Sequence, residues 1–428
     1  MSYRRRTTCR ICGSADLAVF LSLGPQPLAN AFLRSAAETA AERQFPLDVA
    51  LCEQCKLVQS PDVVDPELLF RDYVYRSGFS SSMTAHFAEY ARGVVEELAL
   101  GPADLVVEVA SNDGTLLRKF QAHGVRVLGV EPARNLAAEA RAAGVETVEP
   151  FFGAETGAQL RRERGPARAV VANNVLAHVD DLLGFLQGAR ALLADDGRLV
   201  VESPYLGPLL DHLEYDTVYH EHLSYLSIAP LLAACRVAEL DVVRVDFTPV
   251  HGGSFRLHAR PATGAGHAPA ANALVERERA AGMLDLARYR RFAQDVADHR
   301  DRLVGFLREL RSAGKRIAAY GAPAKGNTLL NWCKIGPELV EFTVDRNPGK
   351  VGTLTPGMHL PVRPVEALLE ARPDFVLVLP WNLVDEIVSQ QAELVRAGTR
   401  FIVPIPAPRL VEGADAAAPR ATARRPDR

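Results

Sequence analysis

The sequence has little net charge and no long apolar runs, and each of these absences excludes a class of function. It has 428 residues, with 49 Lys and Arg against 52 Asp and Glu and a formal net charge of -3. Without a basic excess the chain lacks the field that neutralises nucleic-acid phosphates, so we expect small-molecule partners and no nucleic acid. No apolar run reaches the roughly eighteen residues of a membrane helix, which predicts no membrane span.

Cysteines are also few, and their positions are informative. Residues 1–10 are polar and basic with no apolar stretch behind them, unlike a secretory signal. We therefore expect a cytoplasmic protein, taken as a monomer, in which thiols stay reduced. Of the six cysteines, Cys235 and Cys333 lie in apolar helical patterns and are expected to be buried packing residues. The length favours two or three domains.

The other four cysteines form two close pairs, Cys9-Arg-Ile-Cys12 and Cys52-Glu-Gln-Cys55. Two intervening residues let both sulfurs of a pair reach one ion, and two pairs complete a tetrahedral thiolate shell. The pairs are farther apart than in the commonest zinc ribbons. Disulfides or unrelated thiols are the alternatives. We predict a structural zinc ion, because the protein would fill all four positions.

Strand-like runs alternate with helical stretches in two parts of the chain. The first alternation covers 105–202. Two further strand-like runs follow it, 241–247 and 254–260, and they are expected to pair as an antiparallel hairpin. Buried strands between helices predict a parallel, doubly wound sheet, and the added hairpin is typical of class I methyltransferases. A smaller α/β alternation follows over 316–404. We predict an α/β protein with a zinc-binding domain at 1–65, a methyltransferase domain at 66–270, a second Rossmann-like domain at 271–411 and a disordered tail at 412–428.

The turn after the first strand leads directly into a helix, as cofactor-binding turns do. It departs from the usual glycine pattern, since Ala110 and Asn112 stand where glycines are expected. Glu131 ends the next strand, where a carboxylate can accept ribose hydroxyls, and Glu108 is placed for the amino group of methionine. No phosphate-cradling loop follows, which favours S-adenosylmethionine over NAD; a turn with incidental carboxylates is the alternative. The predicted cofactor-binding residues are Glu108, Ala110, Asn112, Asp113, Gly114, Glu131, Asn173 and Asn174.

Titratable groups are densest in the stretch 214–225, after the fifth strand. It contains His222 beside Glu221, and a histidine next to a carboxylate suits general base catalysis near neutral pH. A metal site or a polar surface loop is the alternative. His178 ends the fourth strand and points to the same edge, unless it only binds a backbone carbonyl. The hydroxyl-rich stretch 72–80 is either a lid or a hinge.

Taken in order, these motifs resemble the sugar C-methyltransferases of antibiotic deoxysugar pathways. The resemblance rests on segments 9–12, 23–30, 52–55, 108–114, 219–222, 251–256 and 320–327. It implies an amino-terminal zinc domain, a class I methyltransferase domain and a carboxy-terminal Rossmann-like domain. It also implies methyl transfer from S-adenosylmethionine to C3, or in some members C5, of a dTDP-linked 4-keto-deoxysugar.

The resemblance further assigns roles to individual residues. His222 is the implied base, and the other implied catalytic residues are Tyr219, Glu221, His178 and either Tyr73 or Tyr75. The implied partners of the sugar nucleotide are His251, Arg256, Lys325 and Asn327; for the turn at 321–327 the alternative is packing alone. Rival functions are an O- or N-methyltransferase on a small metabolite, a non-catalytic sugar-nucleotide-binding scaffold and a dehydrogenase.

Overall fold

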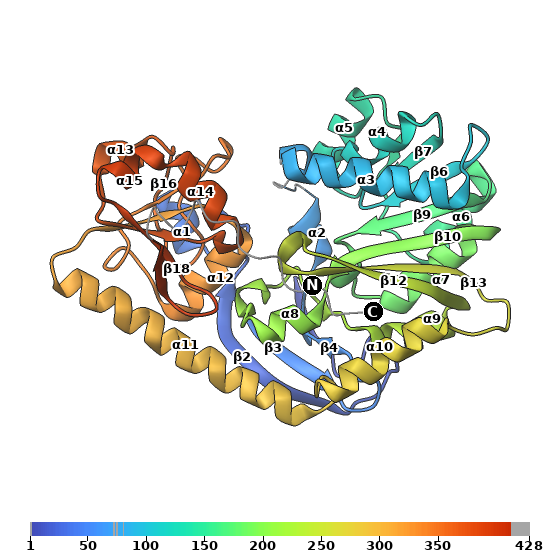
Figure 1. The fold of residues 1–428 in the computed structure, drawn as a ribbon, viewed down its shortest axis with the longest axis horizontal. Coiled ribbons are helices and arrows are strands. Elements are labelled where there is room, and N and C mark those ends of the chain that lie inside the picture. The colour runs from blue at the N-terminus through green and yellow to red at the C-terminus, as the bar shows by residue number, and fades with distance from the viewer. Residues whose placement is uncertain (1, 72, 74–75, 80, 412–428) are drawn as a thin grey trace. The chain divides into compact units, whose positions relative to one another are not determined.

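The computed structural model describes residues 2–411 except 72, 74–75 and 80 (Figure 1). Contacts divide the chain into two compact units. Unit 1 comprises Met1–Ser22, Leu47–Leu209 and His220–Arg290, and unit 2 comprises Leu23–Pro46, Leu210–Tyr219 and Arg291–Arg428. The domain boundaries predicted after residues 65 and 270 stay predictions. The predicted tail at 412–428 lies outside the described residues.

Unit 1 is built around a seven-stranded sheet in the order β12-β13-β10-β9-β6-β7-β8. Strands β10, β9, β6, β7 and β8 are parallel, and β13 runs antiparallel between β10 and β12. The pairing of β12 with β13 confirms the predicted hairpin. The strands are β6 (Leu105–Val109), β7 (Arg126–Val130), β8 (Thr147–Val148), β9 (Ala167–Asn173), β10 (Leu193–Pro204), β12 (Leu240–Thr248) and β13 (Ser254–Pro261).

Helices cover both faces of this sheet (Figure 1). Successive side chains of a strand point to opposite faces. Leu105, Val107 and Val109 of β6 accordingly pack in one core with α6, α7 and α9, whereas Val106 packs in another core with α3 and α4. Two apolar faces explain why these strands are continuous hydrophobic runs. The helices of unit 1 are α3 (Ser81–Leu98), α4 (Thr115–Gln121), α5 (Arg134–Ala142), α6 (Ala154–Arg164), α7 (Leu182–Leu192), most of α8 (Leu206–Asp211), α9 (Ile228–Val237) and α10 (Pro269–Ala280).

The amino-terminal residues form two small sheets, β1-β5 and β11-β4-β3-β2. Strand β11 follows the His220–His222 triplet in the sequence, yet it pairs with β4, Ser224 opposite Gln59. The loop with the candidate base therefore ends in a strand of the amino-terminal sheet. These elements are β1 (Tyr3–Arg5), β2 (Leu17–Pro27), β3 (Gln44–Cys52), β4 (Val58–Gln59), β5 (Asp62–Val64), α2 (Pro66–Phe70) and β11 (Ser224–Tyr225).

Unit 2 contains a six-stranded sheet in the order β16-β15-β14-β17-β18-β19, in which only β19 is antiparallel to its neighbour. The two wound sheets confirm the predicted α/β class. Its strands are β14 (Ile317–Tyr320), β15 (Thr343–Val344), β16 (Val362–Arg363), β17 (Phe375–Val378), β18 (Arg400–Val403) and β19 (Arg409–Val411). Its helices are α1 (Ala36–Ala40), α12 (Ala324–Cys333), α13 (Ala367–Ala371), α14 (Val384–Gln390), α15 (Ala392–Arg396) and most of α11 (Leu286–Ser312).

Short 3-10 turns connect several of these elements. They are η1 (Ser77–Phe79), η2 (Leu176–His178), η3 (Tyr215–Thr217), η4 (Val250–Gly252) and η5 (Trp381–Leu383). Cys235 and Cys333 are buried in α9 and α12, as predicted. Among the helices of the described residues, none combines the length and apolarity that a membrane crossing requires.

Candidate functional site

The two cysteine pairs come together in unit 1. The Sγ atoms of Cys9 and Cys55 are 3.4 Å apart, those of Cys12 and Cys52 are 3.5 Å apart, and all four lie within 4.8 Å of one another. A disulfide needs about 2.05 Å, so these are four free thiols. A tetrahedral zinc ion with Zn–S bonds of about 2.3 Å sets its sulfurs about 3.8 Å apart. The donor set therefore fits a structural zinc ion.

Both zinc knuckles are built in the same way. The N–H of Gly13 bonds to the carbonyl of Cys9 at 3.1 Å, and the N–H of Lys56 bonds to the carbonyl of Cys52 at 2.9 Å. Each of these two residues has a left-handed backbone, with φ of 70° at Gly13 and 64° at Lys56. This turn curls each pair around one point, as a shared ion requires.

The protonation of the thiols also fits a cation. The hydrogen bond between the two thiols lowers the pKa of Cys9 to about 4, and together with burial it raises the pKa of Cys55. Burial raises the pKa of Cys52 to about 11. The four thiols are therefore not expected to deprotonate together unless a cation compensates the negative charge, and metal binding is expected to release protons.

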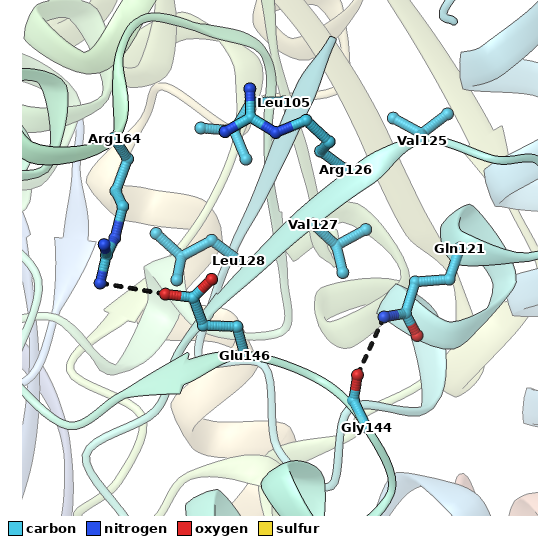
Figure 2. Close-up of a pocket in the computed structure, with 9 residues that line it drawn as sticks. All are labelled: Leu105, Gln121, Val125, Arg126, Val127, Leu128, Gly144, Glu146 and Arg164. Carbon is cyan, nitrogen blue, oxygen red and sulfur yellow. Dashed lines mark hydrogen bonds and ion pairs between the residues drawn. The ribbon is translucent and has the colours of Figure 1, made fainter. Parts of the chain in front are cut away.

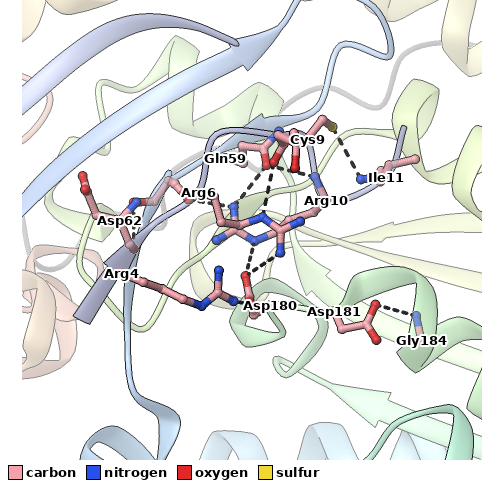
Figure 3. Close-up of polar contacts among 12 residues, drawn as sticks. Arg4, Arg6, Cys9, Arg10, Ile11, Gln59, Asp62, Asp180, Asp181 and Gly184 are labelled. Carbon is pink, nitrogen blue, oxygen red and sulfur yellow. Dashed lines mark hydrogen bonds and ion pairs between the residues drawn. The ribbon is translucent and has the colours of Figure 1, made fainter. Parts of the chain in front are cut away.

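Arg10, between Cys9 and Cys12, extends toward Asp180 in the loop after η2 (Figure 3). Its side chain is fully buried, and its Nε donates to Asp180 Oδ1 at 3.2 Å. Its Nη1 donates to Gln59 Oε1 at 3.1 Å. Arg4 and Arg6 also pair with Asp180. Burial, together with the neighbouring arginines, lowers the pKa of Arg10 to about 9, yet the guanidinium stays charged near neutral pH.

The turn after β6 keeps a glycine-type backbone without the usual glycines. Its φ angles are 57° at Ala110, 52° at Asn112 and 74° at Gly114. A Cβ at Gly114 would also lie 3.0 Å from Val145 Cγ2, so a side chain at this position would be both strained and crowded. Non-glycine residues in this conformation cost energy and cluster at functional sites.

Three carboxylates of this edge have different surroundings. Glu131 accepts the N–H groups of Asn112 and Ala133, both at 2.8 Å. Asp113 accepts the Thr115 hydroxyl at 2.6 Å. Glu108 is buried, and within the described part of the chain its Oε2 has no hydrogen-bond partner. Burial, followed by the charges of Glu131 and Asp113, raises the pKa of Glu108 well above its usual value.

Further unsatisfied polar atoms lie at the ends of neighbouring strands. Both side-chain polar atoms of Asn173, Oδ1 of Asn174 and Oγ of Ser111 are buried without a partner among the described residues. Asn174 has a φ of 54°. An unmade buried hydrogen bond costs about 1–3 kcal/mol, so such a group suits a ligand that makes those bonds. Together with Glu108 these atoms fit the ammonium and hydroxyl groups of S-adenosylmethionine.

Several predicted catalytic residues meet in unit 1. The rings of His178 and His222 have centroids 5.0 Å apart. Burial, and then the neighbouring His222, lowers the pKa of His178 well below its usual value, so this ring is neutral. Glu221 Oε2 accepts the hydroxyl of Tyr73 at 2.9 Å. Tyr75 lies outside the described residues, and Tyr219 ends a stretch of unit 2, so their catalytic roles stay predictions.

A histidine–carboxylate–arginine cluster is a feature that the sequence reading missed. Nε2 of His86 lies 2.7 Å from Glu202 Oε1, and Arg256 Nη2 donates to Glu202 Oε2 at 2.6 Å. Burial raises the pKa of Glu202, but the bonds from His86 and Arg256 more than offset this and leave it lowered. Arg256, a predicted substrate ligand, is thus paired with a carboxylate and lies over the ring of Tyr90. Glu202 could have been found, because it lies near the carboxyl end of its strand, as Glu108 does.

The substrate residues predicted in unit 2 are also engaged. Lys325 bonds to Asn382 and lies 4.2 Å from the ring centroid of Trp381, whose Nε1 donates to Asp216 Oδ2 at 2.7 Å. Burial lowers the pKa of Lys325, partly opposed by Asp216 and a second acid, Glu214, whose own pKa burial raises to about 7.

Of the two remaining predicted substrate ligands, Asn327 alone has a described side chain. The Asn327 side chain is buried and donates to the carbonyl of Ala29 at 2.7 Å. The side chain of His251 lies outside the described residues. Substrate binding by His251, Arg256, Lys325 and Asn327 stays a prediction.

A pocket of about 290 Å³ lies at the amino-terminal edge of the seven-stranded sheet of unit 1, where its parallel strands begin (Figure 2). Leu105 and Arg126, which line it, are the first residues of β6 and β7. Sheets of this kind bind ligands at their carboxyl edge, so this pocket is not the cofactor site. Its other lining residues are Gln121, Val125, Val127, Leu128, Gly144, Glu146 and Arg164.

Comparisons with known proteins cover nearly the whole chain. Family models match residues 9–70 as a zinc binding domain, 83–245 as a methyltransferase domain and 249–406 as a C-methyltransferase C-terminal domain. The C-methyltransferase NovU of Streptomyces niveus is 39% identical over 405 residues, which are 94% of this chain and 96% of NovU.

Solved structures match a smaller part of the chain. The magnesium protoporphyrin IX methyltransferase of Synechocystis PCC 6803 is 17% identical over 41% of this chain and 78% of its own, with a TM-score of 0.31. The CcbJ methyltransferase of Streptomyces caelestis is 18% identical over 41% of this chain and 90% of its own, with a TM-score of 0.32. At these scores the two likenesses do not bear on the function.

Proposed function

The chain belongs to the C-methyltransferase family of NovU, and from this premise we propose that it methylates C3 of a dTDP-linked 4-keto-deoxysugar. It is an S-adenosylmethionine-dependent C-methyltransferase with a zinc-binding module. The nucleotide, the sugar and the carbon are the proposed part, and C5 is the alternative carbon.

One residue, Tyr73, carries this proposal, because it bonds both to Asn135, near the predicted cofactor site, and to Glu221, in the loop that carries His222. Its backbone N–H donates to Asn135 Oδ1 at 3.2 Å, and Asn135 Nδ2 donates back to its carbonyl at 2.8 Å. Asn135 lies in the first turn of α5, directly after the strand that ends near Glu131. The hydroxyl of Tyr73 donates to Glu221, next to His222. Tyr73 therefore connects the segment after the proposed ribose acid, Glu131, to the loop of the proposed base, which supports one shared substrate site.

His222 is the proposed general base. The 4-keto group acidifies the neighbouring C–H, because the charge left on carbon is stored as an enolate. His222 removes that proton, and the neutral ring of His178 can donate a hydrogen bond to the enolate oxygen without itself being deprotonated. Glu221, fixed by Tyr73, is placed to orient the base loop.

The cofactor residues are assigned by the groups that each can satisfy. When bound, S-adenosylmethionine supplies the methyl group, which the substrate carbon takes from its sulfonium. Glu131 is proposed to accept ribose hydroxyls, and Glu108 and Asn173 to bind the methionine end. The turn residues Ala110–Gly114 bring the backbone close to the ligand. This chain has to exclude water around the enolate, which would otherwise be reprotonated.

The test combines a labelled substrate with a base variant. dTDP-4-keto-sugars that carry deuterium at C3 are incubated with S-adenosylmethionine, and product mass is read. We expect a gain of one methyl group with loss of the deuterium. A methylated product that keeps its deuterium would indicate methyl transfer to another atom and would refute C3.

The variant His222→Ala is expected to lower kcat by about two to four orders of magnitude, with cofactor affinity unchanged. His123→Ala, at an exposed position just past α4, is the matched control and should retain full kcat. A loss below about tenfold for His222→Ala would be too small for a general base.

A further inference from the structure

The amino-terminal part of the chain that holds the four clustered cysteines directly contacts the loop that carries His222. Strand β4 pairs with β11, and beyond that pairing the N–H of Ser60 donates to the carbonyl of Leu223 at 3.0 Å. Leu223 immediately follows His222, and its own N–H donates to the carbonyl of Ala177 at 2.8 Å. Leu223, beside His222, is therefore bonded directly to the amino-terminal segment, and Ala177, beside His178, is connected to it through Leu223.

A second connection runs through side chains. Asp180 lies two residues after His178, and it accepts from Arg10 and pairs with Arg4 and Arg6 (Figure 3). Arg10 stands between two of the four clustered cysteines in the sequence, so its backbone position depends on the knuckle. One buried guanidinium thus links the zinc knuckle, β4 through Gln59, and the loop that carries His178.

The chemistry of this link makes it stiff. A buried guanidinium is costly to keep in place unless a carboxylate compensates it, and removing one partner of such a pair leaves an uncompensated charge. Loss of the Asp180 carboxylate would therefore move Arg10 or draw water inward. Either change shifts the loop at 178–181 relative to β11.

We propose that Arg10 and Asp180 are positioning residues through which the zinc knuckle holds His178 against His222. This inference rests on the catalytic roles proposed above for the two histidines. The zinc module is then a part of the active-site scaffold, although the metal takes no part in the chemistry. When a mutation far from the reacting atoms displaces a catalytic group by about 1 Å, the rate can fall about a hundredfold.

Two neighbouring aspartates provide a matched experiment in the zinc-loaded protein. Asp180→Asn is expected to lower kcat about tenfold to a hundredfold, with KM for S-adenosylmethionine within about twofold. Asp181 instead accepts the N–H of Gly184 at 2.9 Å and caps α7. Asp181→Asn should lower the melting temperature and leave kcat unchanged.

A second readout does not depend on activity. The ring resonances of His178 and His222, assigned with His178→Gln and His222→Gln, should shift in Asp180→Asn and stay in place in Asp181→Asn. If Asp180→Asn does not fold, Arg6→Gln at a partly exposed position should give smaller changes in the same direction.

Two results would overturn the inference: equal effects of the two aspartate variants, or an Asp180→Asn protein with unchanged kcat and ring resonances. Shifted resonances in Asp180→Asn combined with a fully active His222→Ala would instead uphold the positioning role and refute the proposed base.

Discussion

The carboxyl edges of the two wound sheets are built on one plan. In unit 1, Glu131, directly after β7, accepts the N–H of Asn112, in the turn after β6, at 2.8 Å. In unit 2, Asp345 after β15 accepts the N–H of Ala322, in the turn after β14, at 2.7 Å. In each case a carboxylate after the second strand holds the turn that opens the first crossover, which is where nucleoside-binding sheets keep their ribose acid.

The two edges differ in whether a positively charged side chain lies near the carboxylate. In unit 2, Lys350 Nζ lies 3.9 Å from Asp345 Oδ2 and donates to the carbonyl of Ala322 at 2.8 Å. In unit 1, the ion pairs of the described residues include none for Glu108 or Glu131, and Glu108 keeps a buried oxygen without a partner there. The edge of unit 1 therefore offers a cofactor a buried carboxyl group that lacks a partner among the described residues, whereas Asp345 at the edge of unit 2 has Lys350 beside it.

The largest expected effect tests this difference between the edges. Glu131→Ala should weaken S-adenosylmethionine binding about a hundredfold or more, because each hydrogen bond to a charged group contributes about 1.5–3 kcal/mol. Asp345→Ala, the matched change in unit 2, should leave the affinity within about twofold. Calorimetric titration of both variants measures this. A comparable loss in Asp345→Ala would contradict the assignment of the cofactor to unit 1 alone.

The second prediction concerns the proton on Glu108. Burial and the neighbouring carboxylates raise the pKa of this group above 4.5, so it is protonated in the free protein at pH values below the raised pKa. A bound ammonium favours the ionised form, and binding then releases a proton. Since the complex holds fewer protons than the free protein, affinity should rise with pH, by up to about tenfold per pH unit within that window.

Glu108→Gln separates this proton from other titrating groups. The amide keeps the shape but cannot ionise, so the variant should bind more weakly at high pH and lose the proton release. Titrations in buffers with different ionisation enthalpies count the protons. The groups that face Glu108 are Glu131, Asp113 and Asn173, with Tyr90 from α3. An unchanged proton count in Glu108→Gln would assign the release to one of the ionisable neighbours (Glu131, Asp113 or Tyr90) or to the ligand.

The sequence predicted what depends on short-range pattern. Strand β6 has apolar residues on both faces, and this alone indicates a strand buried between helices. The two CxxC pairs predicted the cluster of thiols because the ligands of one knuckle are neighbours in sequence. Strand-end acids predicted the carboxylates of the edge, and the same signal, applied once more, would have added Glu202.

What the sequence could not show depends on contacts between distant residues. Lys325 suggested a phosphate ligand by residue type, but its ammonium is held by Asn382 and faces Asp216, more than a hundred positions earlier in the sequence. The pairing of β11 with β4 joins residues that are even farther apart in the sequence. Nor does residue type reveal that Ala110 takes up a left-handed backbone.

The smallest expected effect uses that backbone strain in both units. Ala110 has a φ of 57° in unit 1, and Lys334 has a φ of 53° after α12 in unit 2. Glycine at either position relieves about 1–2 kcal/mol of strain but loses part of this gain to chain entropy, for a net gain of about 0.5–1 kcal/mol. Both tryptophans, Trp332 and Trp381, belong to unit 2, so their fluorescence reports on that unit. In urea, Lys334→Gly should move the fluorescence transition, and Ala110→Gly should move only the transition seen by loss of cofactor binding. If either variant moves both transitions equally, the two units unfold as one, and their edges cannot be compared as independent sites.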